Sequence, residues 1–213
     1  KNTVAGNNTF LGSASGVENT TGIQNTFVGS FAGFSNTTAG NNAFFGYLAG
    51  YGNTAANNSF FGASTGQANT TGYDNAFFGQ GAGQANTIGY ENSFFGKSAG
   101  LRNTVGFRNS FVGINSGINN TIGADNVFIG AAAGTDNQSG SENTFVGVFA
   151  GQKNLAGRNS FFGAGSGQEN TTGTNNAFFG YVAGISNQIG RNNSFFGTNA
   201  GTFNNADFNS FFG

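Results

Sequence analysis

The sequence predicts an all-β protein, a parallel β-solenoid of about twelve coils of 16–17 residues each. Three observations lead to this prediction. The motif N-(T/S/A)-F-(F/V/I/L)-G-x-x-(A/S)-G-x-x-N-T recurs along the chain, and its first Phe returns after 17 residues nine times and after 16 residues three times. Gly and Asn contribute 39 and 35 of the 213 residues, which is typical of sharp backbone corners. Finally, 21 of the 27 Phe residues occupy the two central motif positions, a regularity that a disordered Gly-rich chain has no reason to keep.

Residues 1–213 therefore form a single repeat array. Because the sequence begins and ends within a copy of the motif, we expect it to be a segment of a longer fibrous chain. Helix is excluded, since two or three Gly and at least two Asn in every coil remove its helix propensity.

Each coil is predicted to begin with a short strand, as in residues 42–46 (Asn-Ala-Phe-Phe-Gly). Side chains alternate along a strand, so Asn42 and Phe44 point one way and Ala43 and Phe45 the other. We interpret the invariant first Phe as the core residue.

A narrow coil needs a small side chain opposite each large one. The residue five places after the first Phe is always small in the first eight coils: Ser15, Ala32, Ala49, Thr65, Ala82, Ala99, Ser116 and Ala133. The residue eleven places after it varies in polarity, as expected of a half-buried site (Thr21, Thr38, Ile88, Val105, Ile122 and Ile189).

Two Asn positions recur in every complete coil. The Asn two residues before the first Phe is predicted to form an inward-facing ladder, in which each amide donates to one neighbouring coil and accepts from the other. Its members are Asn8, Asn25, Asn42, Asn58, Asn75, Asn92, Asn109, Asn126, Asn143, Asn159, Asn176, Asn193 and Asn209. A second Asn recurs nine residues after the Phe, from Asn19 to Asn204. A row of Asn residues binding sugar or ions is the less favoured alternative.

The three 16-residue coils all lose their residue after this second Asn, in the segments 53–58, 154–159 and 204–209. That arc tolerates a change of length, so we expect it to be exposed.

The residue after the invariant Phe is always large and apolar. These residues are Leu11, Val28, Phe45, Phe61, Phe78, Phe95, Val112, Ile129, Val146, Phe162, Phe179, Phe196 and Phe212. Alternation places them in an outward-facing stripe, which is predicted to be buried between chains because long apolar stripes are not normally left in water. The alternative is that a bulge brings both doublet residues into one core. We favour the inter-chain interpretation, because two large residues per turn would overpack a narrow coil.

Little in the composition points to catalysis. The chain contains no His or Cys and its formal net charge is −1, which argues against acid–base or thiolate chemistry, Cys-bound metal and nucleic-acid binding. The eight acidic residues are scattered over different coils and lack the spacing of a catalytic pair. No apolar run is long enough to insert into a membrane. We predict no enzyme activity, no cofactor and no metal.

The repeat, quoted as N-x-F-F-G-x-x-A-G-x-x-N-T-x-G, resembles the N-T-A-I-G-type repeats of phage tail-fibre and bacterial surface fibre proteins, which often precede an endosialidase-type chaperone domain. More distantly it is similar to the head repeats of trimeric autotransporter adhesins, which are left-handed parallel β-rolls assembled as trimers. The resemblance covers the whole chain, but a Phe doublet replaces the adhesin V-A-I, and the repeat here is 16–17 residues long.

The resemblance implies a homotrimeric shaft or head segment of an extracellular, cell-surface or virion-associated fibre. Such a fibre would hold a tip, outside this segment, toward a host-cell or prey surface. One alternative is a self-assembling extracellular filament. Another is a solenoid that binds a repetitive glycan or ice surface through the Thr after the second Asn, at Thr20, Thr37, Thr54, Thr70, Thr87, Thr104, Thr121 and Thr171.

Overall fold

The computed structural model describes residues 6–213, which form one continuous parallel β-solenoid of about twelve turns. This confirms the predicted all-β fold. The part of the chain described contains no helix, and therefore none that could cross a membrane. The strands are Thr9–Leu11 (β1), Thr26–Val28 (β2), Ala43–Phe45 (β3), Ser59–Phe61 (β4), Ala76–Phe78 (β5), Ser93–Phe95 (β6), Ser110–Val112 (β7), Val127–Ile129 (β8), Thr144–Val146 (β9), Ser160–Phe162 (β10), Ala177–Phe179 (β11), Ser194–Phe196 (β12) and Ser210–Phe212 (β13).

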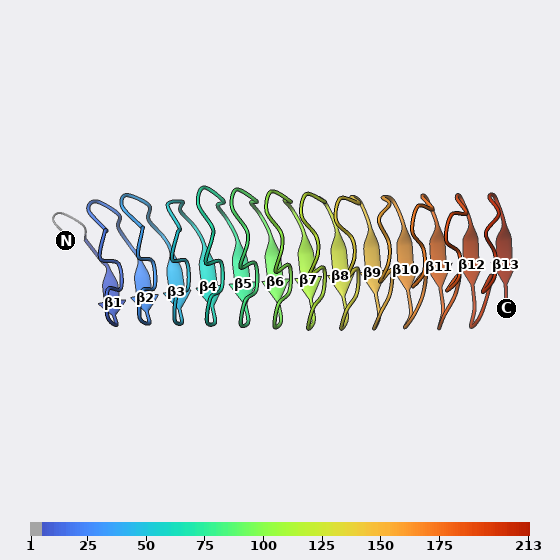
Figure 1. Ribbon diagram of the computed structural model, residues 1–213, viewed down its shortest axis with the longest axis horizontal. Helices are drawn as coiled ribbons and strands as arrows, with labels where there is room; N and C mark the ends of the chain where they lie inside the picture. The colour runs from blue at the N-terminus through green and yellow to red at the C-terminus, as the bar shows by residue number, and fades with distance from the viewer. Residues whose placement is uncertain (1–5) are drawn as a thin grey trace.

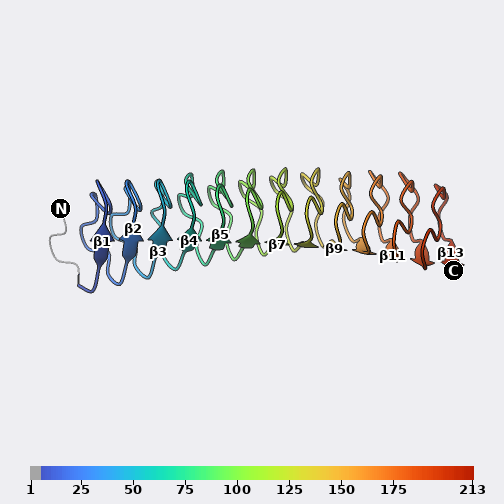
Figure 2. The same cartoon turned by 90° about the horizontal axis from the view of Figure 1, so that it is seen from below.

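Each strand pairs only with the strand of the coil before it and the coil after it. The thirteen strands lie side by side in sequence order along the rod, with β1 at one end and β13 at the other (Figures 1 and 2). The register places equivalent residues on one another, for example Phe94 of β6 on Phe111 of β7. Every position of the motif is thereby repeated as a straight row along the rod.

The core is a single column of Phe rings, the core stack, contributed by the first Phe of every doublet. Neighbouring rings from Phe10 to Phe211 are stacked with centroids 4.6 to 5.0 Å apart. The eleven rings from Phe27 to Phe195 have no exposed surface. Offset stacking of aromatic rings contributes about 0.5–1.5 kcal/mol per pair beyond the burial of their area.

Small residues complete the core on the far side of the coil. Ala82 and Ala99 are fully buried in the same cluster as the Phe rings. The invariant Gly six residues after each Phe packs directly on that ring. A Cβ on Gly83 would lie 2.4 Å from the Phe77 ring, and its φ of +56° also disfavours any other residue.

Two further corners of the coil adopt positive φ, and in most coils the residue there is not Gly. At the fourth residue after the first Phe, Phe31, Leu48 and Val182 have φ values of 60°, 58° and 48°. The amide of each such residue donates to the preceding coil, as Leu48 N–H does to the Ser30 carbonyl over 3.1 Å. Inter-coil pairing therefore holds a conformation that these residue types disfavour in isolation.

The position eleven residues after the Phe is mostly more exposed than the half-buried site expected from its variable polarity. Thr38 is exposed, and Ile122 and Ile189 expose 55% and 58% of their surface, whereas Val105 is half-buried as expected. These residues lie in bends rather than in a strand, so their side chains do not alternate between the inside and the outside of the coil.

The core stack generates the first prediction. Phe94→Ala leaves a cavity within the column and should cost about 3–5 kcal/mol per chain, measured by urea unfolding followed by circular dichroism. Thr71→Ala, at an exposed bend, is the control and should change stability by less than about 0.5 kcal/mol. Equal losses for the two variants would contradict the assignment of Phe94 to the core.

Candidate interaction surface and asparagine ladders

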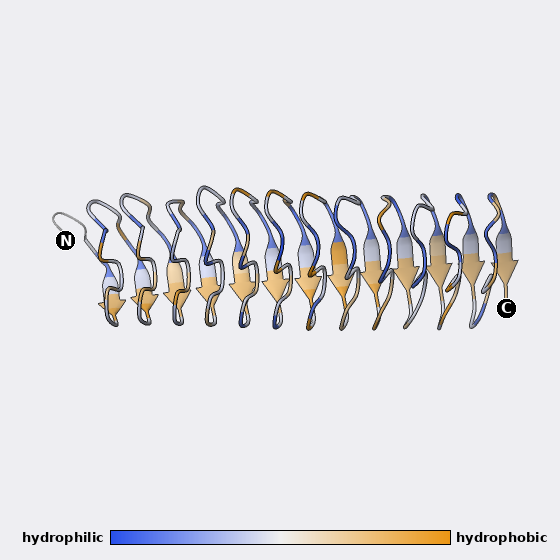
Figure 3. Ribbon diagram, viewed as in Figure 1, coloured by the Kyte–Doolittle hydropathy of each residue, from blue (hydrophilic) through white to orange (hydrophobic). Residues whose placement is uncertain are grey.

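The apolar residue that follows each core Phe lies on the outer face of the sheet. We call this row, from Leu11 to Val28 and on to Phe212, the outer stripe. Phe95, Val112 and Ile129 expose 40%, 39% and 41% of their surface in a single chain. The second half of the strands forms a continuous hydrophobic band along the rod (Figure 3). A single chain therefore presents a row of exposed or partly exposed apolar side chains that runs the length of the array.

Most of the outer stripe is itself stacked. The rings of Phe45, Phe61, Phe78 and Phe95 follow one another with centroids 4.7 to 4.8 Å apart. A second run joins Phe162, Phe179, Phe196 and Phe212 at 4.8 to 5.4 Å. Because each ring rests on the next, the surface is already ordered before any partner binds.

Further exposed apolar residues lie two positions beyond the outer stripe in the sequence: Tyr47, Ile114, Val148 and Tyr181. Sequence reasoning missed them because this position also contains Ser, Ala, Gln and Lys in other coils. An alternation of large apolar and small residues is too irregular to separate from a variable surface position.

The first Asn ladder is the row from Asn8 to Asn209, and most of its side chains are fully buried. Each side-chain oxygen accepts the backbone N–H of the equivalent Asn in the next coil, as in Asn92 N–H to Asn75 Oδ1 at 3.0 Å. Its amide group donates to the backbone carbonyl three residues before the Asn of the next coil, as in Asn75 Nδ2 to Gly89 O at 2.9 Å. The main partner of the oxygen is thus backbone rather than another side chain. Each Asn satisfies two buried backbone groups that the short strands leave unpaired.

The second Asn ladder is the row from Asn19 to Asn204, and it joins side chain to side chain. Asn86 Nδ2 donates to Asn69 Oδ1 at 2.6 Å, and Asn103 Nδ2 donates to Asn86 Oδ1 at 2.7 Å. The same Nδ2 also closes a turn within its own coil, as from Asn86 to Gly89 O at 2.9 Å. All members from Asn19 to Asn187 are fully buried.

The second Asn ladder is interrupted at three places, each just before a 16-residue coil. The buried oxygens of Asn36, Asn137 and Asn187 have no hydrogen-bond partner among the described residues. In the short coil the next Asn turns away, and Asn53 Nδ2 donates to Ala55 O instead, at 2.6 Å. Removing one residue therefore costs one inter-coil bond at each of the three positions.

The Thr row after the second Asn is also used internally. Thr70 Oγ1 donates to the Thr87 carbonyl at 2.9 Å, and Thr104 Oγ1 donates to the Thr121 carbonyl at 3.0 Å. These hydroxyl protons bind the neighbouring coil rather than pointing to solvent. The row has a structural explanation that requires no ligand.

Charged groups are few and lie on the surface. Arg108 and Asp125, equivalent residues of successive coils, form a bidentate pair at 2.6 and 2.9 Å. Hydrogen bonding to Asp125 raises the pKa of the Arg108 guanidinium, and the same bond lowers the pKa of the Asp125 carboxyl group. Within residues 6–213, no three His, Cys, Asp or Glu side chains lie close enough to hold a metal ion.

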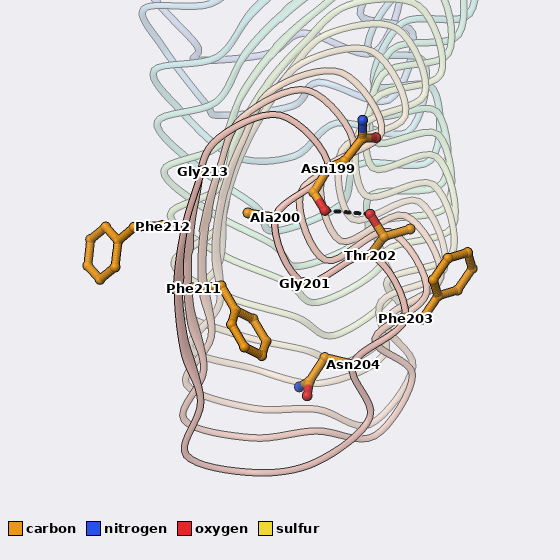
Figure 4. A pocket seen from close by; sticks show the side chains of 9 residues that line it. All are labelled: Asn199, Ala200, Gly201, Thr202, Phe203, Asn204, Phe211, Phe212 and Gly213. Carbon is orange, nitrogen blue, oxygen red and sulfur yellow. Dashed lines mark hydrogen bonds between the residues drawn. The ribbon is translucent and has the colours of Figure 1, made fainter.

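A cavity of about 620 Å³ lies on the exposed face of the last coil. Phe211 points across it and Phe203 points outward, as Figure 4 shows. Its lining residues are the core-stack, Gly and Asn positions that every other coil covers with its neighbour. This cavity is therefore a stacking surface rather than a built ligand site.

Comparison of the chain with protein-family models, with characterised proteins and with solved structures finds no match.

The interrupted ladder generates the second prediction. Both Asn86→Ala and Asn137→Ala remove the bond that closes the turn and the donor to the preceding Asn oxygen, but Asn86→Ala also removes the acceptor of an Asn103 amide proton. Asn86→Ala should therefore be the more destabilising, by about 1–3 kcal/mol. Urea unfolding of both variants at one protein concentration measures the difference. Equal costs would mean that the bond accepted by Asn86 contributes nothing.

Proposed function

We propose that this chain is a structural segment of an extracellular fibre, in which identical chains associate through their outer stripes. The observation that carries the proposal is the outer stripe itself, a continuous apolar row with two stacked runs of Phe rings, whose central residues Phe95, Val112 and Ile129 are about 40% exposed in a single chain. Large contiguous apolar patches on soluble proteins mark interaction surfaces. The most economical partner for a row that repeats at every coil is another row with the same repeat.

A homotrimer fits this surface best. Closed cyclic symmetry buries one narrow stripe per chain around a central axis and leaves the remaining faces in water. Twelve coil steps of about 4.8 Å give a rod about 58 Å long, so association would be continuous over that length. The N-T-A-I-G-type fibre repeats and the trimeric adhesin heads that the motif resembles support the same arrangement.

The fibre would act as a spacer. Its role would be to hold a tip, formed by another part of the protein, toward a host-cell or prey surface. The internal use of the Asn and Thr rows supports a structural role over binding of a glycan or ice lattice, because the regular polar groups of the coil are already paired with each other. We propose no catalytic step and no cofactor.

The third prediction separates the two residues of a doublet. Phe95→Ala should weaken association, so its melting temperature should fall further as the protein is diluted, because the stability that subunits share depends on concentration. Thermal melts over a roughly hundredfold concentration range measure this dependence. Phe95→Asp would place like charges together at the axis and should yield monomers or aggregates.

Phe94→Ala is the matched control, since it damages the core of one chain and should lower stability whether or not chains are associated. A parent protein that melts independently of concentration, and that mass photometry finds to be a monomer, would overturn the proposed assembly.

A further inference from the structure

In an ordinary coil step, four donors converge on one oxygen. The backbone N–H groups of Thr70, Thr71 and Gly72 all point to the carbonyl oxygen of Thr87, at 2.8, 3.2 and 3.3 Å. Thr70 Oγ1 donates to the same oxygen at 2.9 Å. The same convergence of three consecutive N–H groups recurs at the steps that begin at residues 20, 87, 104 and 121. Consecutive N–H groups arranged in this way form an anion-binding concavity, or nest.

At the three steps into a short coil, the carbonyl oxygen equivalent to that of Thr87 no longer accepts these N–H groups. The N–H groups of residues 37–39 and 138–140 have no acceptor within the described chain. The turn that positions them is nevertheless retained, because Asn36 Nδ2 donates to Ala39 O at 3.0 Å just as Asn69 Nδ2 donates to Gly72 O at 2.7 Å. Residues 37–39 therefore keep the geometry of a filled nest without its oxygen.

The third short step has been filled by a different oxygen. Asn205 occupies the position that Thr54 and Leu155 hold in the other two short coils, and its Oδ1 accepts the N–H of Gln188 at 2.6 Å. A side-chain oxygen thus replaces the missing carbonyl for one of the three N–H groups of nest 188–190, that of Gln188. This substitution indicates that the vacated position accepts an oxygen from a group outside the regular backbone ladder.

We propose that nest 37–39 binds one oxygen of a small oxyanion, such as a carboxylate, sulfate or phosphate. The Thr37 hydroxyl provides a fourth donor, by analogy with Thr70 in the filled nest. Thr37 is half-buried and Thr38 is exposed, so a small solute can reach the site. Segments 36–41 and 53–58, which form the two sides of the step, contain no acidic residue that would repel an anion, and the unpartnered acceptor that they do contain, Asn36 Oδ1, is a neutral amide oxygen.

A charged oxygen is a better acceptor for these donors than a neutral one, since hydrogen bonds to ionised groups are shorter and stronger. Nest 138–140 is a weaker second site. It has Gln138 in place of the Thr that supplies the hydroxyl, and its step contains both Glu142 and Arg158, so it gains no net positive charge.

The test is a titration of the ¹⁵N-labelled protein with sodium acetate, sulfate or phosphate, with sodium chloride keeping the ionic strength constant. The amide signals of residues 37–39 should shift and saturate, while those of residues 87–89, whose nest holds the Thr104 carbonyl in a distant coil, should not. The order of affinity among the three salts distinguishes a carboxylate site from a tetrahedral-anion site. Shifts that never saturate, or that are equal in both nests, would overturn the proposal.

Two substitutions test the site in opposite ways: one should fill a nest that is open, and the other should open a nest that is filled. Thr54→Asn copies the residue that fills nest 188–190 and should weaken binding at residues 37–39 by roughly tenfold or more, the effect of removing a bond to a charged group. Asn205→Ala should open nest 188–190 and create saturable shifts at its amides. Far-UV circular dichroism checks that both variants remain folded. If Thr54→Asn leaves binding unchanged and Asn205→Ala gains none, these nests bind water only.

Discussion

The constraint on which this structure depends is the spacing between coils. Parallel strands paired through their backbones lie about 4.8 Å apart, and a constant register brings each residue to within that distance of its equivalents above and below. A large side chain is accepted at a buried position where it can stack on a copy of itself. Flat Phe rings stack with favourable contacts, and an amide can donate and accept at once, so the interior consists mainly of Phe and Asn, with Ala, Gly, Ser and Thr at the small positions.

The same spacing explains why only 7% of the residues are charged. A charge repeated at every coil would face its own copy at a short distance along the rod, which is unfavourable even when exposed. Charged residues are therefore scattered, and where two meet they can have opposite sign, as Arg108 and Asp125 do. Polarity on this surface is supplied mainly by neutral groups.

The period, the Phe doublet and the Gly corners were sufficient to predict the solenoid, because each reports a requirement that recurs in every coil. The corner at Leu48 was not predictable, since Leu disfavours positive φ and only pairing with Ser30 holds it there. The shortened coils were visible as a missing residue, and an exposed arc was expected. The sequence could not indicate that shortening a coil would leave the buried Asn36 oxygen and three backbone N–H groups without hydrogen-bond partners. That outcome depends on which side of the coil moves. Whether the outer stripe joins chains remains a prediction, since the alternation of side chains along a strand identifies the outer face but not the partner that covers it.

Because equivalent residues stack on one another, the fold also places no limit on the number of coils and hence on the length of the rod. Each coil contacts only the coil before it and the coil after it, and all such contacts are nearly the same. Duplicating or deleting one 17-residue repeat would change the rod by about 4.8 Å and would require no new complementary surface. Recombination between repeats can therefore lengthen or shorten the rod in uniform steps. The number of coils can thus change without a change in the fold of any one of them.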